Sequence, residues 1–263
     1  MAAHQLTSSR FAIRGVPVFM YHDLCAASAS DERYTTPLPV FKEHLSFLRE
    51  QEFDVQDLPA LNVNSNNRSV VLTFDDGLAS HYQLAFPALL EHELTATFFV
   101  TTALVESSGY LTWNQLREMS AAGMTIGSHG REHIDYTGLP PASAERELQS
   151  SRLALEDHLG KPASTFSAPY GFLNHALTGA ARDAGFRWIC SSHPWLATAD
   201  ASVISRLAVY HDTALTHFSA LANRNALPLL ARRARNALLH LPKQLLLRTS
   251  PRRLGVHVGQ EVK

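Results

Sequence analysis

The sequence predicts an α/β protein built on a parallel sheet. Short apolar runs alternate with segments of helical periodicity up to about residue 220. The clearest run, Ser-Val-Val-Leu-Thr-Phe at 69–74, is continuous, as is typical of a strand buried on both faces. Polar residues directly follow several of these runs, where parallel strands collect functional groups. A barrel and a doubly wound sheet both fit this pattern, so the residues alone leave the topology open.

The same periodicity gives the individual elements. Thr112 is expected to cap its helix, and Gly123 and Gly160 to end the helices before them. Strands are expected at 16–20, 69–74, 96–101, 124–128, 165–168 and 186–190, and helices at 40–51, 78–91, 112–122, 142–159 and 176–184.

Composition is that of an ordinary globular chain. The 263 residues are 45% hydrophobic and carry a formal net charge of −1, so no basic excess indicates a nucleic-acid partner. No signal peptide is expected in the N-terminal segment, and no run is long enough to span a bilayer. Cys25 and Cys190 form no disulfide framework. The protein is therefore expected to be cytoplasmic.

The first candidate for chemistry is the carboxylate pair Asp75 and Asp76, which follows the 69–74 strand. Two adjacent carboxylates repel each other, and a bound cation removes that penalty. The alternative is an ordinary Asp-Gly turn that closes the strand.

The second candidate is the histidine pair His129 and His133, which follows the 124–128 strand. On a helical turn, side chains four residues apart share a face and chelate one metal ion. Two histidines, one carboxylate and an open position for water are a common catalytic zinc set. Exposed histidines in a polar loop are the alternative.

Taken together, Thr-Phe-Asp-Asp-Gly at 73–77 and His-x-x-x-His at 129–133 resemble the polysaccharide deacetylase family, carbohydrate esterase family four. The resemblance extends over about residues 15–222 and includes Met-Tyr-His-Asp at 20–23, Leu-Thr-Trp at 111–113 and Ala-Pro-Tyr-Gly at 168–171. It implies a distorted (β/α) barrel with fewer than eight regular strands. It also implies removal of an N-acetyl group from an amino sugar.

The resemblance assigns roles to residues. Asp76, His129 and His133 would hold a divalent metal, usually zinc and sometimes cobalt or nickel. Asp75 would be the general base. The backbone N–H of Tyr170 would stabilise the oxyanion, and His211 would protonate the departing amine.

Four further residues are candidates for contact with substrate: His22, Trp113, Pro169 and Arg206. Some of the candidate site residues also have a structural alternative. Trp113 is also expected to suit helix packing, Pro169 and Tyr170 a tight turn, and His211 an ordinary strand end.

The match departs from the family at two informative positions. Many members carry an arginine that orients the catalytic aspartate two residues before the Pro-Tyr pair, where this chain has Ser167. Arg206 is our candidate to replace that arginine from another strand. Gly130 stands after the first metal histidine, where the family prefers Ser or Thr, so a less rigid loop is expected.

Three segments are expected: an N-terminal tail at 1–14, the catalytic domain at 15–224 and a basic amphipathic extension at 225–263. A cationic amphipathic helix suits an anionic membrane surface, and packing on the domain is the alternative. Within the extension, Pro242 is expected to interrupt the helix.

The expected function is therefore metal-dependent removal of an N-acetyl group from a polysaccharide, oligosaccharide or lipid-linked glycan precursor, as in exopolysaccharide biosynthesis. Two alternatives remain. The same metal site would suit an O-deacetylase or a small-molecule amidohydrolase. A degenerate carbohydrate-binding protein would lack a functional site, although Asp75 and the three candidate ligands are intact.

Overall fold

The computed structural model describes residues 13–63, 68–199 and 201–247. Its centre is an eight-stranded sheet in the order β10-β1-β5-β6-β7-β8-β9, with β4 paired to β5 as well. Every pairing in this sheet is parallel. Its strands are β1 (Val18–Tyr21), β4 (Asp54–Gln56), β5 (Ser69–Phe74), β6 (Thr97–Val100), β7 (Thr125–Ser128), β8 (Thr165–Ser167), β9 (Trp188–Cys190) and β10 (Leu207–Ala208).

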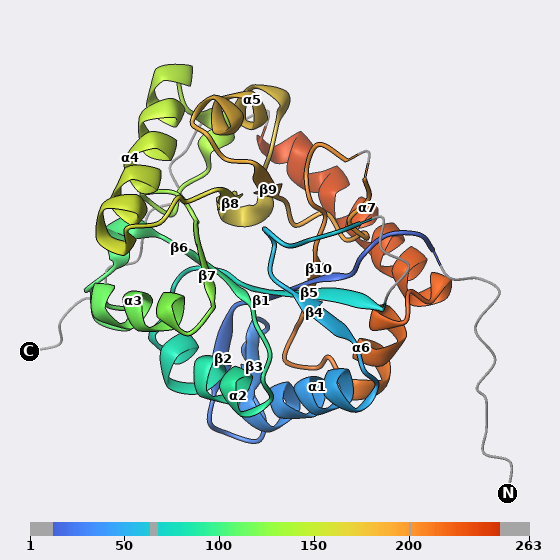
Figure 1. The fold of residues 1–263 in the computed structure, drawn as a ribbon. Helices are drawn as coiled ribbons and strands as arrows, with labels where there is room; N and C mark the ends of the chain where they lie inside the picture. Colours follow the sequence, from blue (N-terminus) through green and yellow to red (C-terminus); the bar gives the residue numbers. More distant parts are fainter. Residues whose placement is uncertain (1–12, 64–67, 200, 248–263) are drawn as a thin grey trace, which may run out of the picture.

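The sheet curls until its two edges approach each other. Ile204 forms a parallel bridge with Cys190 of β9, and three residues later Leu207 pairs with Phe19 of β1. One short segment therefore contacts both edges. Figure 1 shows the curled sheet inside a ring of helices. The predicted distorted barrel is confirmed, and the doubly wound alternative is not the fold. The expectation of fewer than eight strands is not met, because the two-residue β10 brings the sheet to eight.

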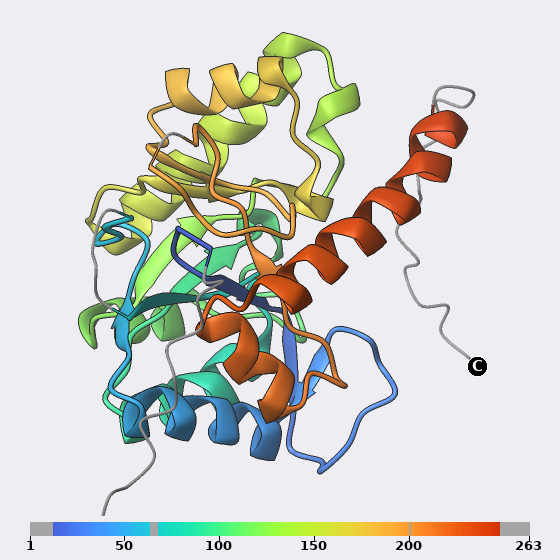
Figure 2. The same ribbon diagram turned by 90° about the vertical axis from the view of Figure 1, so that its right-hand side faces the viewer.

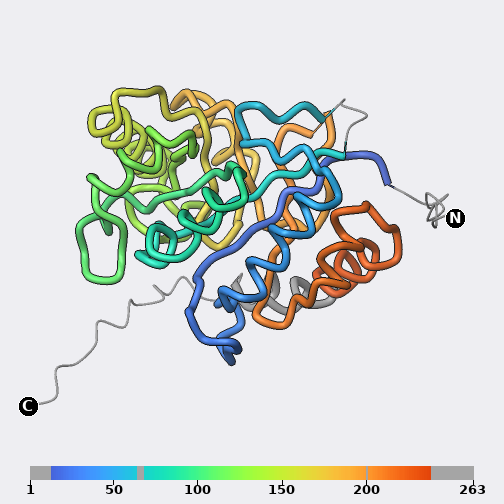
Figure 3. The backbone as a smooth tube through the Cα atoms, turned by 60° about the horizontal axis from the view of Figure 1, so that its bottom comes forward, coloured from blue at the N-terminus to red at the C-terminus, as the bar shows by residue number. Residues whose placement is uncertain are grey.

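Helices cover the outside of the sheet. In Figure 3, α6 lies beside α1, and the two helices are in contact. Buried aromatic and aliphatic side chains fill the space between helices and strands. The α-helices are α1 (Leu38–Glu50), α2 (Phe86–Glu91), α3 (Trp113–Ala121), α4 (Pro141–Leu159), α5 (His175–Asp183), α6 (Leu215–Ala222) and α7 (Ala226–Leu247).

The predicted helix ends are confirmed where local chemistry sets them. Thr112 caps α3 through a capping box, in which its side chain accepts from the Gln115 N–H and the Gln115 side chain accepts from the Thr112 N–H. Gly160 ends α4 in the left-handed conformation, with φ of 64°.

The predicted helix at 78–91 is confirmed, but a π-helical segment interrupts its α-helical hydrogen bonding. A π-helical turn, η1 (His81–Ala85), precedes α2, and the Phe86 N–H donates to the carbonyl of His81, five residues earlier. Pro87 in the first turn of α2 lacks an N–H, so the regular hydrogen-bond pattern starts again there.

Several short elements were not predicted. β2 (Asp23–Cys25) and β3 (Thr35–Pro37) form a separate parallel pair beside the barrel, and β4 and β10 are equally short. Three 3-10 turns also occur, η2 (Thr102–Leu104), η3 (Tyr136–Gly138) and η4 (Pro169–Gly171). Strands of two or three residues are too short for the alternation of apolar and polar residues that predicts a strand.

The C-terminal helix α7 extends away from the barrel, as Figure 2 shows. It continues through Pro242, so the predicted interruption there is wrong. Leu227 and Leu230 are exposed, whereas Arg232 and Arg233 contact the rings of Tyr210 and Trp195. Within the described part of the chain, no helix is long and apolar enough to cross a membrane.

The boundaries of the three segments stay a prediction. The tail at 1–12 and the end of the extension at 248–263 lie outside the described residues.

Candidate active site

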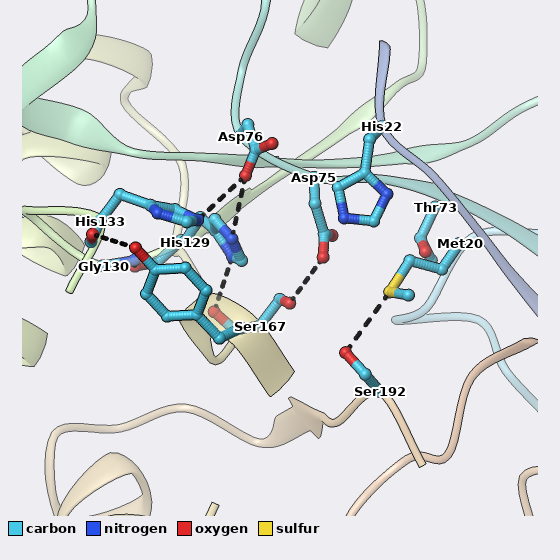
Figure 4. Close-up of polar contacts among 12 residues, drawn as sticks. Met20, His22, Thr73, Asp75, Asp76, His129, Gly130, His133, Ser167 and Ser192 are labelled. Carbon is cyan, nitrogen blue, oxygen red and sulfur yellow. Dashed lines mark hydrogen bonds and ion pairs between the residues drawn. The ribbon is translucent and has the colours of Figure 1, made fainter. Parts of the chain in front are cut away.

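Three potential metal ligands meet where β5 and β7 end. The Nε2 atoms of His129 and His133 each lie 3.3 Å from Oδ1 of Asp76. One ligand atom from each residue falls within 4.8 Å of the others. Figure 4 shows both imidazoles directed at the Asp76 carboxylate. The structure therefore brings together the three ligands expected from the sequence.

The turn after β5 directs the two aspartates differently. Asp76 and Gly77 both have left-handed backbones, with φ of 79° and 78°. Such a conformation is costly for a residue other than glycine and is concentrated at functional sites. At Gly77 a Cβ atom would also come within 3.0 Å of the Val100 side chain. The strained turn places the Asp76 carboxylate beside the histidines.

The second nitrogen of His129 has a fixed partner. Its Nδ1 lies 2.9 Å from the Ser167 carbonyl of β8, to which it donates as Nδ1–H. With that proton on Nδ1, Nε2 of the neutral imidazole is the nitrogen that can bind a metal, and in the protonated imidazole Nε2–H donates to Asp76. A backbone carbonyl bonded to the far nitrogen is typical of metal-binding histidines, because it fixes the tautomer and the ring orientation. His129 is almost fully buried, whereas His133 is partly exposed.

Residues 129–133 form a loop and not the helical turn expected from their spacing. Gly130 has φ of 81°, and a Cβ atom there would lie 2.0 Å from the Tyr136 hydroxyl. That hydroxyl accepts from the Arg131 N–H at 3.0 Å and lies 3.0 Å from both the Glu132 carbonyl and the Glu147 carboxylate. The expectation of a less rigid loop is wrong, because Tyr136 braces it.

Asp75 lies in a separate, buried environment. It forms a two-point ion pair with Arg206, with both Nη–Oδ distances at 2.7 Å. The Ser167 hydroxyl donates to Asp75 at 3.2 Å and accepts from Arg206 at 2.7 Å. Both partners of the pair are almost wholly inaccessible to solvent.

Arg206 therefore takes the place of the arginine that the family pattern carries at the Ser167 position. The segment that joins β9 to β1 holds Arg206 just before β10 and turns its guanidinium into the barrel. The small Ser167 side chain leaves room for it. The Arg206 side chain is 0% exposed, which favours this pairing role over the expected substrate contact.

These contacts shift the pKa values of the two aspartates. Burial would raise the pKa of Asp75, but the charges of Arg206 and His129 outweigh burial and hold that pKa below its ordinary value. Burial also opposes ionisation of Asp76, and hydrogen bonds from His129 and His133 bring its pKa well below the ordinary value. Both carboxylates are therefore ionised at neutral pH.

The donor set fits a divalent metal. One carboxylate oxygen and two imidazole nitrogens are the ligands of many catalytic zinc sites, and zinc, cobalt and nickel all accept them. Asp75 already has a cationic partner in Arg206. In the described part of the chain, no lysine or arginine lies within ion-pair distance of Asp76. The cluster around Asp76 is the one that a metal cation would complete.

Tyr170 stands at the exposed rim of this cluster. It has φ of 60°, its side chain is 52% exposed, and its ring packs edge-on against His133 at 4.6 Å. Its hydroxyl donates to the His133 carbonyl at 3.3 Å. Among the hydrogen bonds of the described residues, none uses the Tyr170 N–H as donor.

Pro169, the residue before Tyr170, is buried. Its burial favours the turn role over the expected substrate contact.

The remaining predicted site residues, His22, Trp113 and His211, lie in different surroundings. His22 lies beside Asp75 in Figure 4, and burial lowers its pKa, against the charges of Asp75 and Asp76. The Trp113 ring stacks on His158 at 3.9 Å, so the packing alternative is the one that the structure favours over a sugar contact. His211 follows β10, and its N–H donates to the Arg33 carbonyl at 3.1 Å. In the described part of the chain, no hydrogen bond or ion pair joins His211 to Asp75 or to the three ligands.

Two contributors were not predicted from the sequence: Ser167 as a partner in the ion pair and Tyr136 as the brace of the histidine loop. Ser167 was noted only as a missing arginine. A glycine after a metal histidine was the one available signal for Tyr136, because glycine there leaves room for a bulky neighbour.

Comparison with known proteins agrees with this geometry. A family model described as polysaccharide deacetylase matches residues 62–189, which include the aspartate pair, both histidines and the Pro-Tyr turn. Over these residues the chain belongs to the polysaccharide deacetylase family.

Two relatives illustrate the family. YxkH of Bacillus subtilis (strain 168), which is named after the same family, is 25% identical over 70% of this chain and 67% of its own length. A chitooligosaccharide deacetylase of Rhizobium leguminosarum bv. trifolii is 28% identical over 54% of this chain and 66% of its own. The chain thus spans about two thirds of each relative.

Solved structures of the family share the fold. The Streptococcus pyogenes deacetylase PplD, solved with acetate, superposes with a TM-score of 0.72 and 21% identity over 81% of this chain and 98% of its own. IcaB from Ammonifex degensii gives a TM-score of 0.69 and 24% identity over the same shares of the two chains. At these identities the likeness concerns the fold.

Proposed function

We propose that this protein is a metal-dependent carbohydrate deacetylase that removes the N-acetyl group from an amino sugar of a glycan. One observation carries the proposal. An ionised carboxylate, Asp75, is oriented by a buried arginine directly beside a set of three metal ligands. This pairing of a base with a metal site is what amide hydrolysis needs. The named activities of the chitooligosaccharide and peptidoglycan deacetylases among its relatives support the amino sugar.

Asp76, His129 and His133 would hold the metal, and zinc is the ion that their ligand types suit best. When bound, the metal would polarise the acetyl carbonyl and lower the pKa of water to about 7. The Ser167 carbonyl keeps His129 in the tautomer that such binding requires.

Asp75 would take the proton from the attacking water. Arg206 holds both of its oxygens, so the carboxylate cannot rotate away, and its depressed pKa keeps it ionised at neutral pH. The free N–H of Tyr170 would donate to the oxygen that becomes negative as the amide carbonyl is attacked. His211 remains the proposed acid for the departing amine, on the family pattern alone.

Acetate release tests the proposal. Wild-type protein loaded with zinc is incubated with N-acetylglucosamine oligomers, and acetate is measured alongside the zinc content. We expect acetate from the wild type and none from Asp75→Asn. Zinc binding without acetate from N-acetylated sugars, but with acetate from O-acetylated ones, would establish the O-deacetylase alternative. Absence of zinc binding would favour the degenerate carbohydrate-binding protein.

For the C-terminal extension we propose peripheral contact with an anionic membrane. Exposed Leu227 and Leu230 at the start of α7 support it, although Arg232 is turned towards the domain. Flotation of the wild type with anionic vesicles, compared with the Leu227→Ser/Leu230→Ser variant, tests it. Equal flotation would mean that these leucines do not mediate contact.

A further inference from the structure

Two tyrosines and an arginine form a strip that the proposed chemistry does not use. The rings of Tyr34 and Tyr210 lie 5.4 Å apart, and the Arg33 guanidinium lies 5.5 Å and 4.7 Å from their respective centroids. We call these three residues the tyrosine platform. Tyr34 precedes β3 and Tyr210 follows β10, so the fold brings together segments that are far apart in the sequence.

The platform is continuous with the active site. The Tyr34 ring lies 4.7 Å from the ring of His22. His22 directly follows Tyr21, whose carbonyl accepts from the Asp75 N–H at 3.0 Å, and the His22 carbonyl accepts from Nε2 of buried His81 at 2.7 Å. The backbone of His22 is therefore fixed between the catalytic carboxylate and the platform.

The strand order places the platform on one flank of the catalytic residues. At the carboxyl ends of the strands, Tyr210 follows β10 and His22 follows β1; next in the sheet order come the aspartates after β5 and His129 after β7. Exposed Tyr170 follows β8, beyond the histidines. Exposed aromatic side chains thus stand on both sides of the proposed reaction centre.

The platform has the surface of a sugar site. Tyr34 is 43% exposed, whereas most other rings near β1, such as Tyr21 and Phe41, are fully buried. An aromatic face suits the C–H groups of a pyranose, and tyrosine and arginine supply hydrogen bonds at its edge. Nδ1 of His22 is buried and has no hydrogen-bond partner among the described residues. An unpartnered buried nitrogen at this junction calls for a ligand group, such as a sugar hydroxyl.

We propose that Tyr34, Tyr210 and Arg33 form a subsite for a second sugar unit, adjacent to the one that loses its acetyl group. This inference rests on the proposed function and defines its substrate as an oligosaccharide or polysaccharide, not a free monosaccharide. The occupant is a pyranose ring linked to the reacting sugar, because the platform adjoins His22, which lies beside Asp75.

Binding and turnover test the subsite separately. Zinc-loaded Asp75→Asn protein is titrated calorimetrically with N-acetylglucosamine and with its trimer. We expect the trimer to bind about tenfold more tightly than the monomer, because one stacked ring contributes on this scale. Tyr34→Ala, introduced into the same protein, should remove most of that difference, whereas Tyr34→Phe should retain it.

Leu90→Ala is the matched control, since Leu90 is 47% exposed but lies on α2 without a ring contact. In the wild-type background, Tyr34→Ala should raise KM for the trimer more than it lowers kcat. Equal binding of monomer and trimer, absence of binding, or a trimer preference that survives Tyr34→Ala would overturn the subsite. If acetate is released while that preference is absent, the proposed function stands without the subsite. If Tyr34-dependent trimer binding occurs without acetate release, the subsite stands and the proposed function fails.

Discussion

Asp75 and Asp76 are neighbours in the sequence but lie in opposite environments. Asp75 is 2% exposed and paired at two points with Arg206. Asp76 is about a quarter exposed, with a side-chain value of 26%, and faces two imidazoles. One carboxylate already has a permanent cation, Arg206, within the protein, whereas the other faces two imidazoles that can serve as metal ligands.

This difference in environment distinguishes a general base from a metal ligand, although the two aspartates are adjacent in the sequence. An aspartate fixed by a guanidinium remains ionised and oriented, which suits a base. An aspartate beside two histidines needs a metal cation to offset its charge, which suits a ligand. Each of the following predictions tests whether the two environments are as independent as the structure indicates.

The largest effect is expected from replacing each aspartate in turn. Asp75→Asn should retain zinc but lose deacetylation by on the order of 10²–10⁴-fold, because the base is lost. Asp76→Asn should lose zinc and activity together. Metal analysis of purified protein, beside acetate release, distinguishes the two variants. Loss of zinc from both would show that Asp75 is itself a ligand.

Arg206→Met tests the ion pair. Removal of the guanidinium leaves Asp75 buried and unpaired, which should lower the free energy of unfolding by about 3–5 kcal/mol. It should also raise the pKa of Asp75, since burial then acts without the opposing charge. The base works when ionised, so activity that is lost as the pH falls should be lost at a higher pH in this variant.

Denaturant unfolding and the pH profile of kcat/KM check both effects of Arg206→Met. Arg187→Met is the control, because Arg187 is exposed and its guanidinium only stacks on Trp188. An unchanged acid limb of the profile would contradict the role of Arg206.

His44 allows acid unfolding to be separated from titration of the site. Burial lowers the pKa of His44 to about 4, against the hydrogen bond to the Thr213 carbonyl. The unfolded chain, with a histidine pKa of about 6.5, therefore takes up the proton first as the pH falls. Stability should fall by roughly 3 kcal/mol between about pH 6.5 and 4.

His44→Gln should flatten this fall in stability, as followed by denaturant midpoints across the pH range. An equally steep fall in the variant would assign acid sensitivity to other groups. Activity that is lost at a higher pH than this fall in stability, while the protein is still folded, would belong to the active site.

The smallest effect concerns the loop that carries both histidines. Gly130→Ala combines a left-handed backbone with a clash against Tyr136, so we expect a loss of about 1–3 kcal/mol of stability. Zinc affinity should fall by about 10–100-fold, since the loop that presents His133 must move. At Gly138 a Cβ atom would meet nothing within 4 Å, so Gly138→Ala is the matched control. Similar zinc affinity in both variants would mean that the brace is dispensable.

Local sequence patterns predicted much of the fold. The 69–74 strand and the Thr112 cap were predictable because burial on both faces and capping chemistry are written in adjacent residues. The short strands β2, β4 and β10 were not, since each is defined only by its pairing with another segment, and the π-helical turn within 78–91 was not predicted either. The helical turn predicted at 129–133 failed because a four-residue spacing fits a braced loop equally well.

The sequence by itself determined which residues meet at the site, because strand ends in a parallel sheet converge and Asp75, Asp76 and His129 each follow one. Only the tertiary structure decided how the two aspartates differ. Arg206 lies 131 positions from Asp75 and reaches it only because the chain curls until β9 and β10 approach. No local sequence pattern encodes this closure of the sheet. The closure brings Arg206 to Asp75, and it therefore determines that Asp75 already has a cationic partner whereas Asp76 requires a metal.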